Sequence, residues 1–275
     1  MCAPADRRLR RSVRDRSGWA ASGLRVPVDT IAAPLFPRKL PWVNVKSPPS
    51  SIQRGRPLLV EFWDFCRPNS VRTLPYLKAW HERYAEAGLR IVGVHCPGFA
   101  ISHEEEAVRA AVARLEISYP VLIDSELELW REYENEGWPA RYLFDGSGRL
   151  FEYHFGEGAY AETERAIQEL LGVEGEPVPP LRPEDAPGAA LSPPSADREG
   201  AYDGPYEAGG VWAVLDGAGT VRVNGGPSAG GAEVTITHPG AYPLLEHARH
   251  TVGVLEIEIG PGVECVATCF TPGVS

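Results

Sequence analysis

The sequence lacks the features that mark several classes of protein. It has no run of 18 consecutive apolar residues, which excludes a typical membrane-spanning helix within the printed chain. Glycine and proline are frequent, at 29 and 26 of 275 residues, but they follow no fixed period, which excludes a collagen-like chain. With 43% hydrophobic and 23% charged residues, the composition is typical of a soluble folded protein with one large or two smaller domains.

Cysteine is also scarce. Five cysteines are too few for a fold built on disulfides, their number is odd, and no two are spaced as C-x-x-C. They are Cys2, Cys66, Cys96, Cys265 and Cys269. A zinc site of four cysteines therefore has no support, and we expect no metal or other cofactor. Cys265 and Cys269 lie four residues apart in an expected strand, so we expect both side chains on one face, buried and not bonded to each other.

Histidine offers a second candidate metal site. His247 and His250 are the only tight histidine pair, with Glu246 beside them. A zinc site needs more ligands than this, and no third well-placed ligand follows, so we favour surface-loop histidines over a metal site. The chain also lacks a Ser-His-Asp spacing signature, a P-loop and a dinucleotide-binding fingerprint.

The net charge of −10 combines two parts of opposite sign. Residues 1–60 hold 12 Lys and Arg against 3 Asp and Glu, whereas residues 61–275 hold 15 against 34. An arginine-rich tail is typical of contacts with nucleic acid or acidic surfaces, but no binding motif follows this one. We therefore expect residues 1–25 to be a solvated, disordered tail, and we expect no nucleic-acid partner. No apolar core follows the arginines, so the tail does not resemble a secretory signal, and we expect a cytoplasmic protein.

Residues 26–171 are expected to form one α/β domain. Seven prolines between residues 27 and 57 predict extended, turn-rich structure at its start. Continuous apolar runs then predict buried strands, and apolar residues at helical spacing predict the helices between them. The expected strands are Leu58–Trp63, Leu89–His95, Tyr119–Ile123, Ala140–Phe144 and Arg149–Phe155; helices are expected from Asn69 or Ser70, from a capping box at Ser102 and Glu105, from Glu126 and from Ala161. This order predicts a mainly parallel sheet with an antiparallel edge.

The rest of the chain is expected to form a linker and a second domain. Residues 172–198 contain seven prolines, which predicts a semi-rigid linker. Past it, short alternating segments are separated by turn dipeptides such as Asp216-Gly217. The expected strands are Val211–Leu215, Thr220–Val223, Glu233–Thr237, Ala241–Leu245, Val252–Ile259 and Val263–Phe270. Residues 199–275 are therefore expected to form a small β-sandwich-like domain.

Several stretches of the α/β part resemble the thioredoxin-like, redoxin family, in particular the type found in the soluble part of DipZ-like proteins. They read PLLVEFWDF from residue 57, ISYPVLIDS from residue 117, GWPARYLFDGSGRL from residue 137 and FGEGAY from residue 155. The C-terminal stretch that reads AYPLLEHARHTVGVLEIEIGPGVECVATCF from residue 241 resembles the carbohydrate-binding-like β-domain that follows thioredoxin in such proteins. The resemblance implies a three-layer thioredoxin-like fold with a mixed central sheet, and descent from thiol–disulfide oxidoreductases.

In that family the chemistry depends on a C-x-x-C motif at the start of the first helix, where the helix dipole favours the thiolate of the first cysteine. The family's first cysteine lies four positions after the tryptophan of the strand, which from Trp63 is Arg67. Its second lies five positions before the helix proline, which from Pro75 is Ser70. Both counts indicate that Arg67-Pro68-Asn69-Ser70 replaces the motif, and Cys66 lies one residue too early.

Two interpretations of Cys66 remain open. As a single nucleophile, its thiolate would be favoured by the adjacent Arg67 and by the helix N-terminus, with Cys96 as a resolving cysteine. Alternatively, Cys66 is a small residue packed at the end of a strand, as free cysteines commonly are. Because Cys96 follows the neighbouring parallel strand, both cysteines should lie at the same edge of the sheet. A Cys66–Cys96 disulfide is therefore a hypothesis, which requires Cα atoms within about 7 Å.

Other parts of the family's site are retained in the sequence. Pro139 occupies the place of the family's cis-proline, which presents backbone beside the active loop. The resemblance implies a substrate-facing groove lined by Trp63, Phe65, His95 and Trp138, for which packing around a degenerate site is the alternative. The helix start at Arg67 and Ser70 is also a candidate anion site.

We therefore expect a two-domain, redoxin-type protein that has lost its dithiol and acts as a binding or scaffold module. A protein or thiol partner is expected at the thioredoxin-like groove. The first alternative is a single-cysteine thiol oxidoreductase or peroxidase that uses Cys66. The second is a glycan- or protein-binding function of the C-terminal β-domain.

Overall fold

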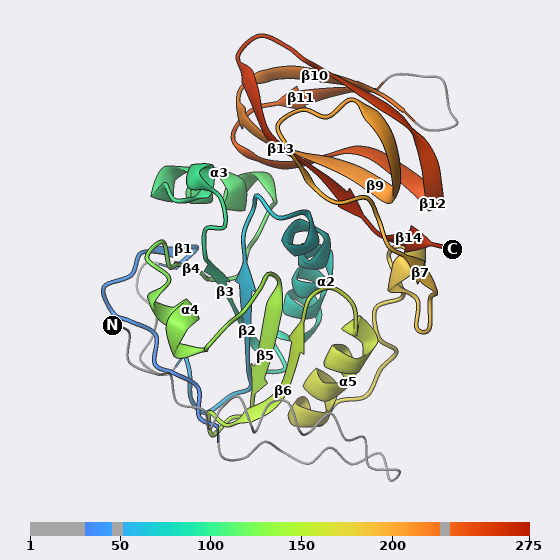
Figure 1. The fold of residues 1–275 in the computed structure, drawn as a ribbon. Coiled ribbons are helices and arrows are strands. Elements are labelled where there is room, and N and C mark those ends of the chain that lie inside the picture. The colour runs from blue at the N-terminus through green and yellow to red at the C-terminus, as the bar shows by residue number, and fades with distance from the viewer. Residues whose placement is uncertain (1–30, 46–51, 226–231) are drawn as a thin grey trace, which may run out of the picture.

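The computed structural model describes residues 31–45, 52–225 and 232–275, and the expected basic tail over residues 1–25 lies outside them. The described chain forms an α/β domain and an all-β domain, and the second lies against one end of the first (Figure 1). Among these described residues, no helix combines the length and the apolar character needed to span a membrane.

A mixed six-stranded sheet forms the centre of the α/β domain. In spatial order its strands are β1 (Trp42–Val43), β4 (Val121–Ile123), β3 (Arg90–His95), β2 (Leu58–Trp63), β5 (Ala140–Phe144) and β6 (Leu150–Phe155). β2, β3 and β4 are parallel, while β5 is antiparallel to β2, β6 to β5, and β1 to β4. The parallel part is confined to three strands because the chain after β4 re-enters the sheet beside β2 from the opposite end.

Helices cover both faces of the sheet (Figure 1). One face packs against α2 (Pro68–Tyr84), α3 (Glu105–Arg114) and α5 (Tyr160–Leu171), and the other against α4 (Glu128–Glu132) and residues 31–42. α2 begins at Pro68, one residue before the expected start, because a proline in the first turn removes only an N–H that has no helical partner.

β2 is buried on both sides of the sheet, as its continuous apolar run predicts. Leu59 and Trp63 point into the cluster with α2, whereas Leu58, Val60 and Phe62 point into the cluster with α4. Full burial of one such side chain stabilises the fold by about 1.5–3 kcal/mol. The sheet therefore fixes the position of the loop that follows Trp63.

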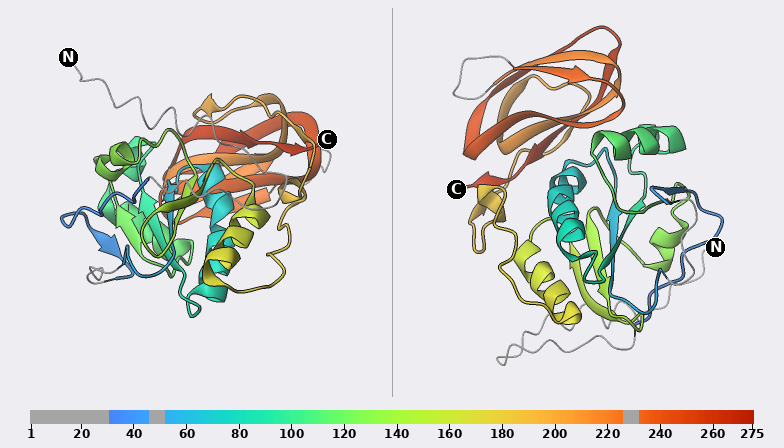
Figure 2. Two further views of the ribbon diagram at one scale, coloured as in Figure 1. Left: turned by 90° about the horizontal axis from the view of Figure 1, so that it is seen from below. Right: turned by 180° about the vertical axis from the view of Figure 1, so that it is seen from behind.

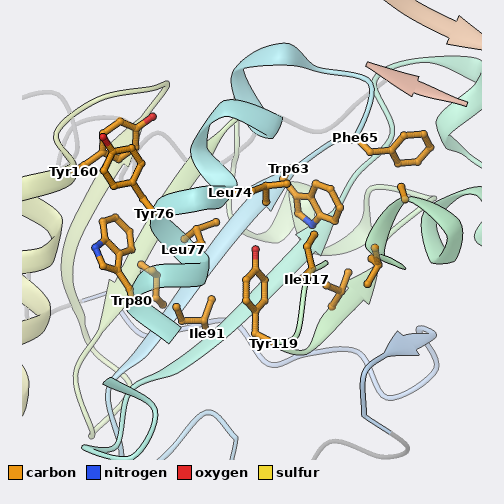
Figure 3. Packing of buried hydrophobic residues seen from close by; sticks show 14 of the residues in the cluster. Trp63, Phe65, Leu74, Tyr76, Leu77, Trp80, Ile91, Ile117, Tyr119 and Tyr160 are labelled. Carbon is orange, nitrogen blue, oxygen red and sulfur yellow. The ribbon is translucent and has the colours of Figure 1, made fainter. Parts of the chain in front are cut away.

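α2 and α5 are joined by aromatic and polar contacts. Tyr76 of α2 stacks on Tyr160 of α5, as Figure 3 shows. The ring centroids lie 3.7 Å apart. Nearby, the buried carboxylate of Glu164 accepts hydrogen bonds from Trp80 Nε1 at 2.9 Å and from the Tyr84 hydroxyl at 2.7 Å. These contacts hold the middle and the C-terminal end of α2 against α5.

The loop after β3 differs from the expected capping box. Ser102 ends a short 3-10 turn, η1 (Ala100–Ser102), and α3 starts only after Glu104, without a side-chain cap. The Ser102 hydroxyl instead lies 3.0 Å from the Phe99 carbonyl oxygen and 3.3 Å from the Asp64 carboxylate. The hydroxyl thus donates to buried acceptors instead of capping α3, and the Ser102 side chain is buried.

The proline-rich segment 172–198, expected to be a linker, is bound to both domains. Its first part contains a 3-10 turn, η2 (Pro183–Asp185), and its second part contains two short strands, β7 (Leu191–Ser192) and β8 (Arg198–Glu199). β7 pairs with β14 (Gly273–Val274) at the end of the chain, and β8 pairs with β13 (Val263–Thr271) of the all-β domain. Backbone hydrogen bonds thus fix this segment to the rest of the protein, whereas its proline content predicts only a semi-rigid linker.

The all-β domain is a six-stranded sheet that folds over its own core (Figures 1 and 2). In spatial order its strands are β11 (Ala232–Ile236), β10 (Gly219–Asn224), β12 (Gly240–Ile259), β9 (Gly204–Gly217), β13 and β8. The all-β prediction is confirmed. The two strands expected at 241–245 and 252–259 are one strand, β12, whose pairing with β9 is interrupted between Glu246 and Thr251.

A β-bulge in β13 separates the two C-terminal cysteines. The register with β9 shifts between Cys265 and Ala267, and one extra residue reverses the faces that the following side chains take. Cys269 is buried on the outer face beside Trp212 and Val214, whereas Cys265 packs against the inner core. The expectation of one common face is therefore wrong, although both thiols are free.

Candidate functional site

The loop between β2 and α2 carries the candidate site. Asp64, Phe65 and Cys66 follow the end of β2 and are fully buried, and Arg67 is the N-cap of α2. Ser70 lies in the first turn of α2, where its hydroxyl accepts a hydrogen bond of 3.2 Å from the Asp64 backbone N–H. The two positions that the family's cysteines occupy are thus one helical turn apart, as the sequence count requires.

Asp64 organises this loop, and the sequence analysis did not single it out. Its Oδ1 accepts a hydrogen bond of 2.9 Å from the Cys66 N–H, and its Oδ2 accepts one of 2.7 Å from the Gly98 N–H. The Ser102 hydroxyl is 3.3 Å from the same Oδ2. An acid directly after a fully buried apolar strand was the available signal, because a buried carboxylate needs several donors.

The Cys66 thiol is held in its protonated form. Burial raises its pKa above the ordinary range, and the charge of Asp64 raises it further. The charges of Arg114 and Arg67 and a hydrogen bond with Ser102 lower the pKa, but burial is the largest effect. Burial therefore raises the pKa of Cys66 by more than Arg67 lowers it, and the thiolate that Arg67 and the helix N-terminus were expected to favour is not formed.

Cys96 lies at the same edge of the sheet but has a different partner. Its Sγ is 3.5 Å from Asp124 Oδ2, and burial raises its pKa, as does the charge of Asp124. Cys66 and Cys96 are both free thiols, so the hypothetical disulfide between them is not formed in this structure. Asp124 also accepts the N–H groups of Glu128 and Trp130, which fixes its carboxylate at the start of α4.

Arg67 binds aromatic rings. Its guanidinium carbon lies 4.8 Å from the Phe99 ring centroid and 4.9 Å from the Trp138 ring centroid. A guanidinium held between two aromatic faces is stabilised by cation–π attraction. The Ser70 hydroxyl is engaged by Asp64, so the two residues of the candidate anion site point to different partners.

The expected groove is closed. Trp63, Phe65 and His95 have no exposed surface, and His95 is stacked on Phe65 with ring centroids 5.1 Å apart. His95 Nε2 lies 3.6 Å from Asp64 Oδ1. These three side chains, expected to line a substrate groove, are thus core residues.

The proline next to the loop has the expected peptide geometry. The Trp138–Pro139 peptide bond is cis, as the resemblance implies. Trp138 is partly exposed and donates a hydrogen bond of 2.9 Å from Nε1 to the Cys96 carbonyl oxygen, while Pro139 is buried. These residues therefore stand beside the Cys66 loop, as the family's pattern requires.

The all-β domain makes direct contact with the Cys66 loop. The Ala241 N–H donates a hydrogen bond of 2.9 Å to the Phe65 carbonyl oxygen. Arg114 of α3 lies over the Tyr242 ring at 4.4 Å from its centroid. Phe65 and Cys66 share one buried apolar cluster with side chains of the all-β domain, namely Trp212, Val214, Ala241, Ala267 and Cys269. Arg114 and this outer face had no distinguishing sequence signal, because each contact joins segments far apart in the chain.

The histidine pair, expected in a surface loop, lies in β12, and both side chains are partly buried. His247 lies 2.9 Å from the Tyr206 hydroxyl, and His250 lies 3.5 Å from a Glu207 carboxylate oxygen. Across the described part of the chain, no three His, Cys, Asp or Glu side chains are grouped so that they could hold a metal ion.

Comparisons with known proteins match the α/β domain. The chain is 36% identical over 146 residues to protein DipZ of Mycobacterium bovis, covering 51% of this chain and 21% of DipZ. It is 25% identical over 130 residues to the thiol-disulfide oxidoreductase YkuV of Bacillus subtilis, covering 47% of this chain and 87% of YkuV. A solved thiol-disulfide isomerase from Corynebacterium glutamicum aligns with a TM-score of 0.45 and 23% identity, over 52% of this chain and 98% of that one.

No family model matches the chain. The match spans only 21% of the length of DipZ, so that relative contains much that this comparison does not include. The α/β domain has a thioredoxin-like fold, and the chain is similar over about half of its length to DipZ and to the thiol-disulfide oxidoreductase YkuV.

Proposed function

We propose that this chain is a non-dithiol member of the thiol–disulfide oxidoreductase lineage and acts as a binding or scaffold module. The observation that carries the proposal is the complete burial of Cys66 beneath the all-β domain. Thiol–disulfide exchange requires a thiolate that can reach the partner's disulfide. A buried, protonated thiol meets neither requirement.

The residues at the helix start also support this proposal. Dithiol exchange needs a second thiol one turn along the helix to resolve the mixed disulfide. Position 70 holds a serine whose hydroxyl is bonded to Asp64, and position 67 holds an arginine stacked between two rings. Both side chains have structural partners, so neither position is available for redox chemistry.

The single-cysteine alternative is favoured by one specific feature. Arg67, Arg114 and Ser102 all act to lower the pKa of Cys66. If the edge were open to water, the burial effect would shrink and these three groups would favour the thiolate. The alternative therefore requires Cys66 to be accessible during turnover.

Insulin reduction in the presence of dithiothreitol separates the two functions. We expect wild type, Cys66→Ser and Cys96→Ser all to show the background rate, and we expect no consumption of hydrogen peroxide. The matched control is Cys96→Ser, because Cys96 is equally buried at the same edge of the sheet. Turnover by wild type that is lost in Cys66→Ser would overturn the proposal and establish the single-cysteine enzyme.

A further inference from the structure

The all-β domain is attached to the α/β domain through a chain segment with two separate anchors. The first anchor lies on α2 and α5. The Val178 N–H donates a hydrogen bond of 2.7 Å to the buried Glu164 carboxylate, and the Leu181 N–H donates one of 2.8 Å to the Tyr76 hydroxyl oxygen. Residues 178–185 therefore belong to the α/β domain as a rigid extension.

A buried ion-pair cluster strengthens this first anchor. The Arg72 side chain is only 5% exposed, with Nε 3.0 Å from a Glu157 carboxylate oxygen and Nη2 2.8 Å from Glu184. The Arg72 carbonyl oxygen accepts a hydrogen bond of 2.9 Å from Arg182 Nη1. Two charged residues of the segment are thus fixed to α2.

The second anchor belongs to the all-β domain. The Ser195 N–H donates a hydrogen bond of 2.8 Å to the Glu207 carbonyl oxygen, and Asp197 accepts one of 3.1 Å from the Phe270 N–H. β7 and β8 pair with β14 and β13. Residues 191–199 therefore move with the all-β domain.

A short connection, residues 186–190, lies between the two anchors. Pro187 and Gly188 are exposed, and Gly188 has a φ of +75°, with nothing within 4 Å of the place where a Cβ would lie. The Ala189 N–H donates a hydrogen bond of 3.0 Å to the Ala186 carbonyl oxygen, so backbone torsions in this turn can change at the cost of that bond and without loss of side-chain packing at Gly188. This is the property of a hinge.

The interface that this connection spans leaves polar groups without partners. Among the described residues, Nε and Nη2 of Arg114 and Nε1 of Trp212 are buried without a hydrogen-bond acceptor, and the contact of Arg114 Nη1 with the Ala241 carbonyl oxygen is 3.5 Å long. Buried donors without acceptors lose the hydrogen bonds that water would give them. Separation of the two faces would hydrate these donors, which offsets part of the lost apolar contact.

We propose that the all-β domain is a lid, hinged at residues 186–190, whose opening exposes the Cys66 edge of the α/β domain. Cys66 and Cys269 lie on the two sides of the same buried cluster, so opening exposes both thiols together. Cys96 lies in the cluster on the opposite face of the sheet and stays covered. This inference goes beyond the proposed function, because it concerns access to the edge and does not depend on whether Cys66 reacts with a substrate.

The rates of thiol labelling by N-ethylmaleimide test the lid on the full chain, with each cysteine followed by peptide mass spectrometry. We expect Cys66 and Cys269 to be labelled at one common rate, about ten-fold or more above that of Cys96, since a local opening is more frequent than global unfolding. Arg114→Ala removes both its contact with the Tyr242 ring and its unpartnered donors, so it should change the rates of Cys66 and Cys269 by one common factor of about five and leave that of Cys96 unchanged. The matched control is Arg109→Ala on the same helix, whose contacts with Glu105 and the Trp42 carbonyl stay within the α/β domain.

Equal labelling rates at Cys66 and Cys96 in wild type would overturn the lid, because global unfolding exposes both. Labelling of Cys66 without Cys269 would also overturn it, since fraying of one loop does not require the domains to separate. Should Arg114→Ala fail to fold, the comparison of the three wild-type cysteines still decides the question. The insulin assay measures turnover and not exposure, so the lid and the proposed function can fail separately.

Discussion

The backbone N–H of Ala241 donates a hydrogen bond to the carbonyl oxygen of Phe65, with 2.9 Å between the two atoms, and the two residues belong to different domains. Phe65 directly precedes Cys66. The loop that leads into the first helix, where thiol–disulfide oxidoreductases carry their dithiol, is therefore part of a domain interface in this chain. Cys66 itself lies in a buried cluster to which both domains contribute side chains.

The register of the replaced motif is open to direct test. In a Cys66→Ala background, the double change Arg67→Cys and Ser70→Cys should produce an intramolecular disulfide after mild oxidation. The two positions are the N-cap residue and a first-turn residue of α2, one turn apart, and a disulfide needs Cα atoms about 4.4–6.8 Å apart. Mass spectrometry after alkylation under non-reducing conditions measures the product.

The matched control for this register combines Arg67→Cys with Asn69→Cys in the same background. Positions two residues apart project from different sides of a helix, so no bond between them is expected. If positions 67 and 70 both remain open to alkylation after oxidation, the register that places the motif there is wrong.

A second prediction concerns the ion pairs that fix the segment after α5. Arg72→Met should lower the free energy of unfolding by about 3–5 kcal/mol, because it leaves the carboxylates of Glu157 and Glu184 without their buried partner. The control is Arg222→Met, which removes an exposed contact with Glu233 and should leave stability nearly unchanged. Urea denaturation of both variants measures the difference, and similar losses would contradict the buried role of Arg72.

The parts of the fold that the sequence predicts well depend on local patterns. β2 has the predicted bounds because a continuous apolar run ends at Asp64, a residue that must be bonded if it is buried. The helix after it starts at Pro68, close to the predicted start, since proline favours a first turn. Hydrophobic periodicity and the residues that begin or end an element depend only on a few neighbouring residues, so a single sequence is enough to recognise them.

Features that depend on distant residues could not be predicted. Proline content predicts that segment 172–198 is not an α-helix. It does not predict that Glu164 and Tyr76 accept hydrogen bonds from the backbone N–H groups of this segment. The bulge after Cys265 reverses the face of Cys269, and nothing in the intervening residues indicates it. The closed edge at Phe65 arises only because the all-β domain packs on it, and no local pattern records that contact.

Gly98 supports a third prediction. A Cβ at this position would lie 2.8 Å from Arg67 Nε and 3.0 Å from Asp64 Oδ2, so Gly98→Ala must displace the guanidinium from its place between the Phe99 and Trp138 rings. We expect a loss of about 1–3 kcal/mol in the free energy of unfolding, as for other overpacked sites.

The matched control is Gly137→Ala, where a Cβ would have nothing within 4 Å. There we expect no loss, and a small gain from the stiffer unfolded chain. Urea denaturation of both variants gives the comparison. Equal stability of Gly98→Ala and wild type would show that Arg67 can leave its aromatic neighbours without cost, and that its stacking does not order the loop.

The last prediction is a pH dependence that arises from Glu61. This residue is 1% exposed in the middle of β2, and among the described residues neither carboxylate oxygen has a hydrogen-bond donor. Burial raises its pKa from the ordinary 4.5 to about 8, and the charge of Arg141, its neighbour on β5, only partly offsets this shift. The folded protein therefore holds a proton on Glu61 at neutral pH.

The sign of the effect follows from proton linkage. Below pH 4.5 both states are protonated, but between about 4.5 and 8 only the folded state keeps the proton, so unfolding releases it and stability falls as the pH rises, by up to about 1.4 kcal/mol per pH unit. Glu61→Gln removes the titrating group and with it this pH-dependent contribution to the free energy of unfolding. We therefore expect the variant to gain stability relative to wild type from about pH 5 to pH 8, with no further gain above about pH 8, in urea denaturation at matched pH. Because the comparison is a difference between two proteins, other titrating groups cancel, and a difference that does not change with pH would mean that Glu61 is ionised against Arg141 in the folded state.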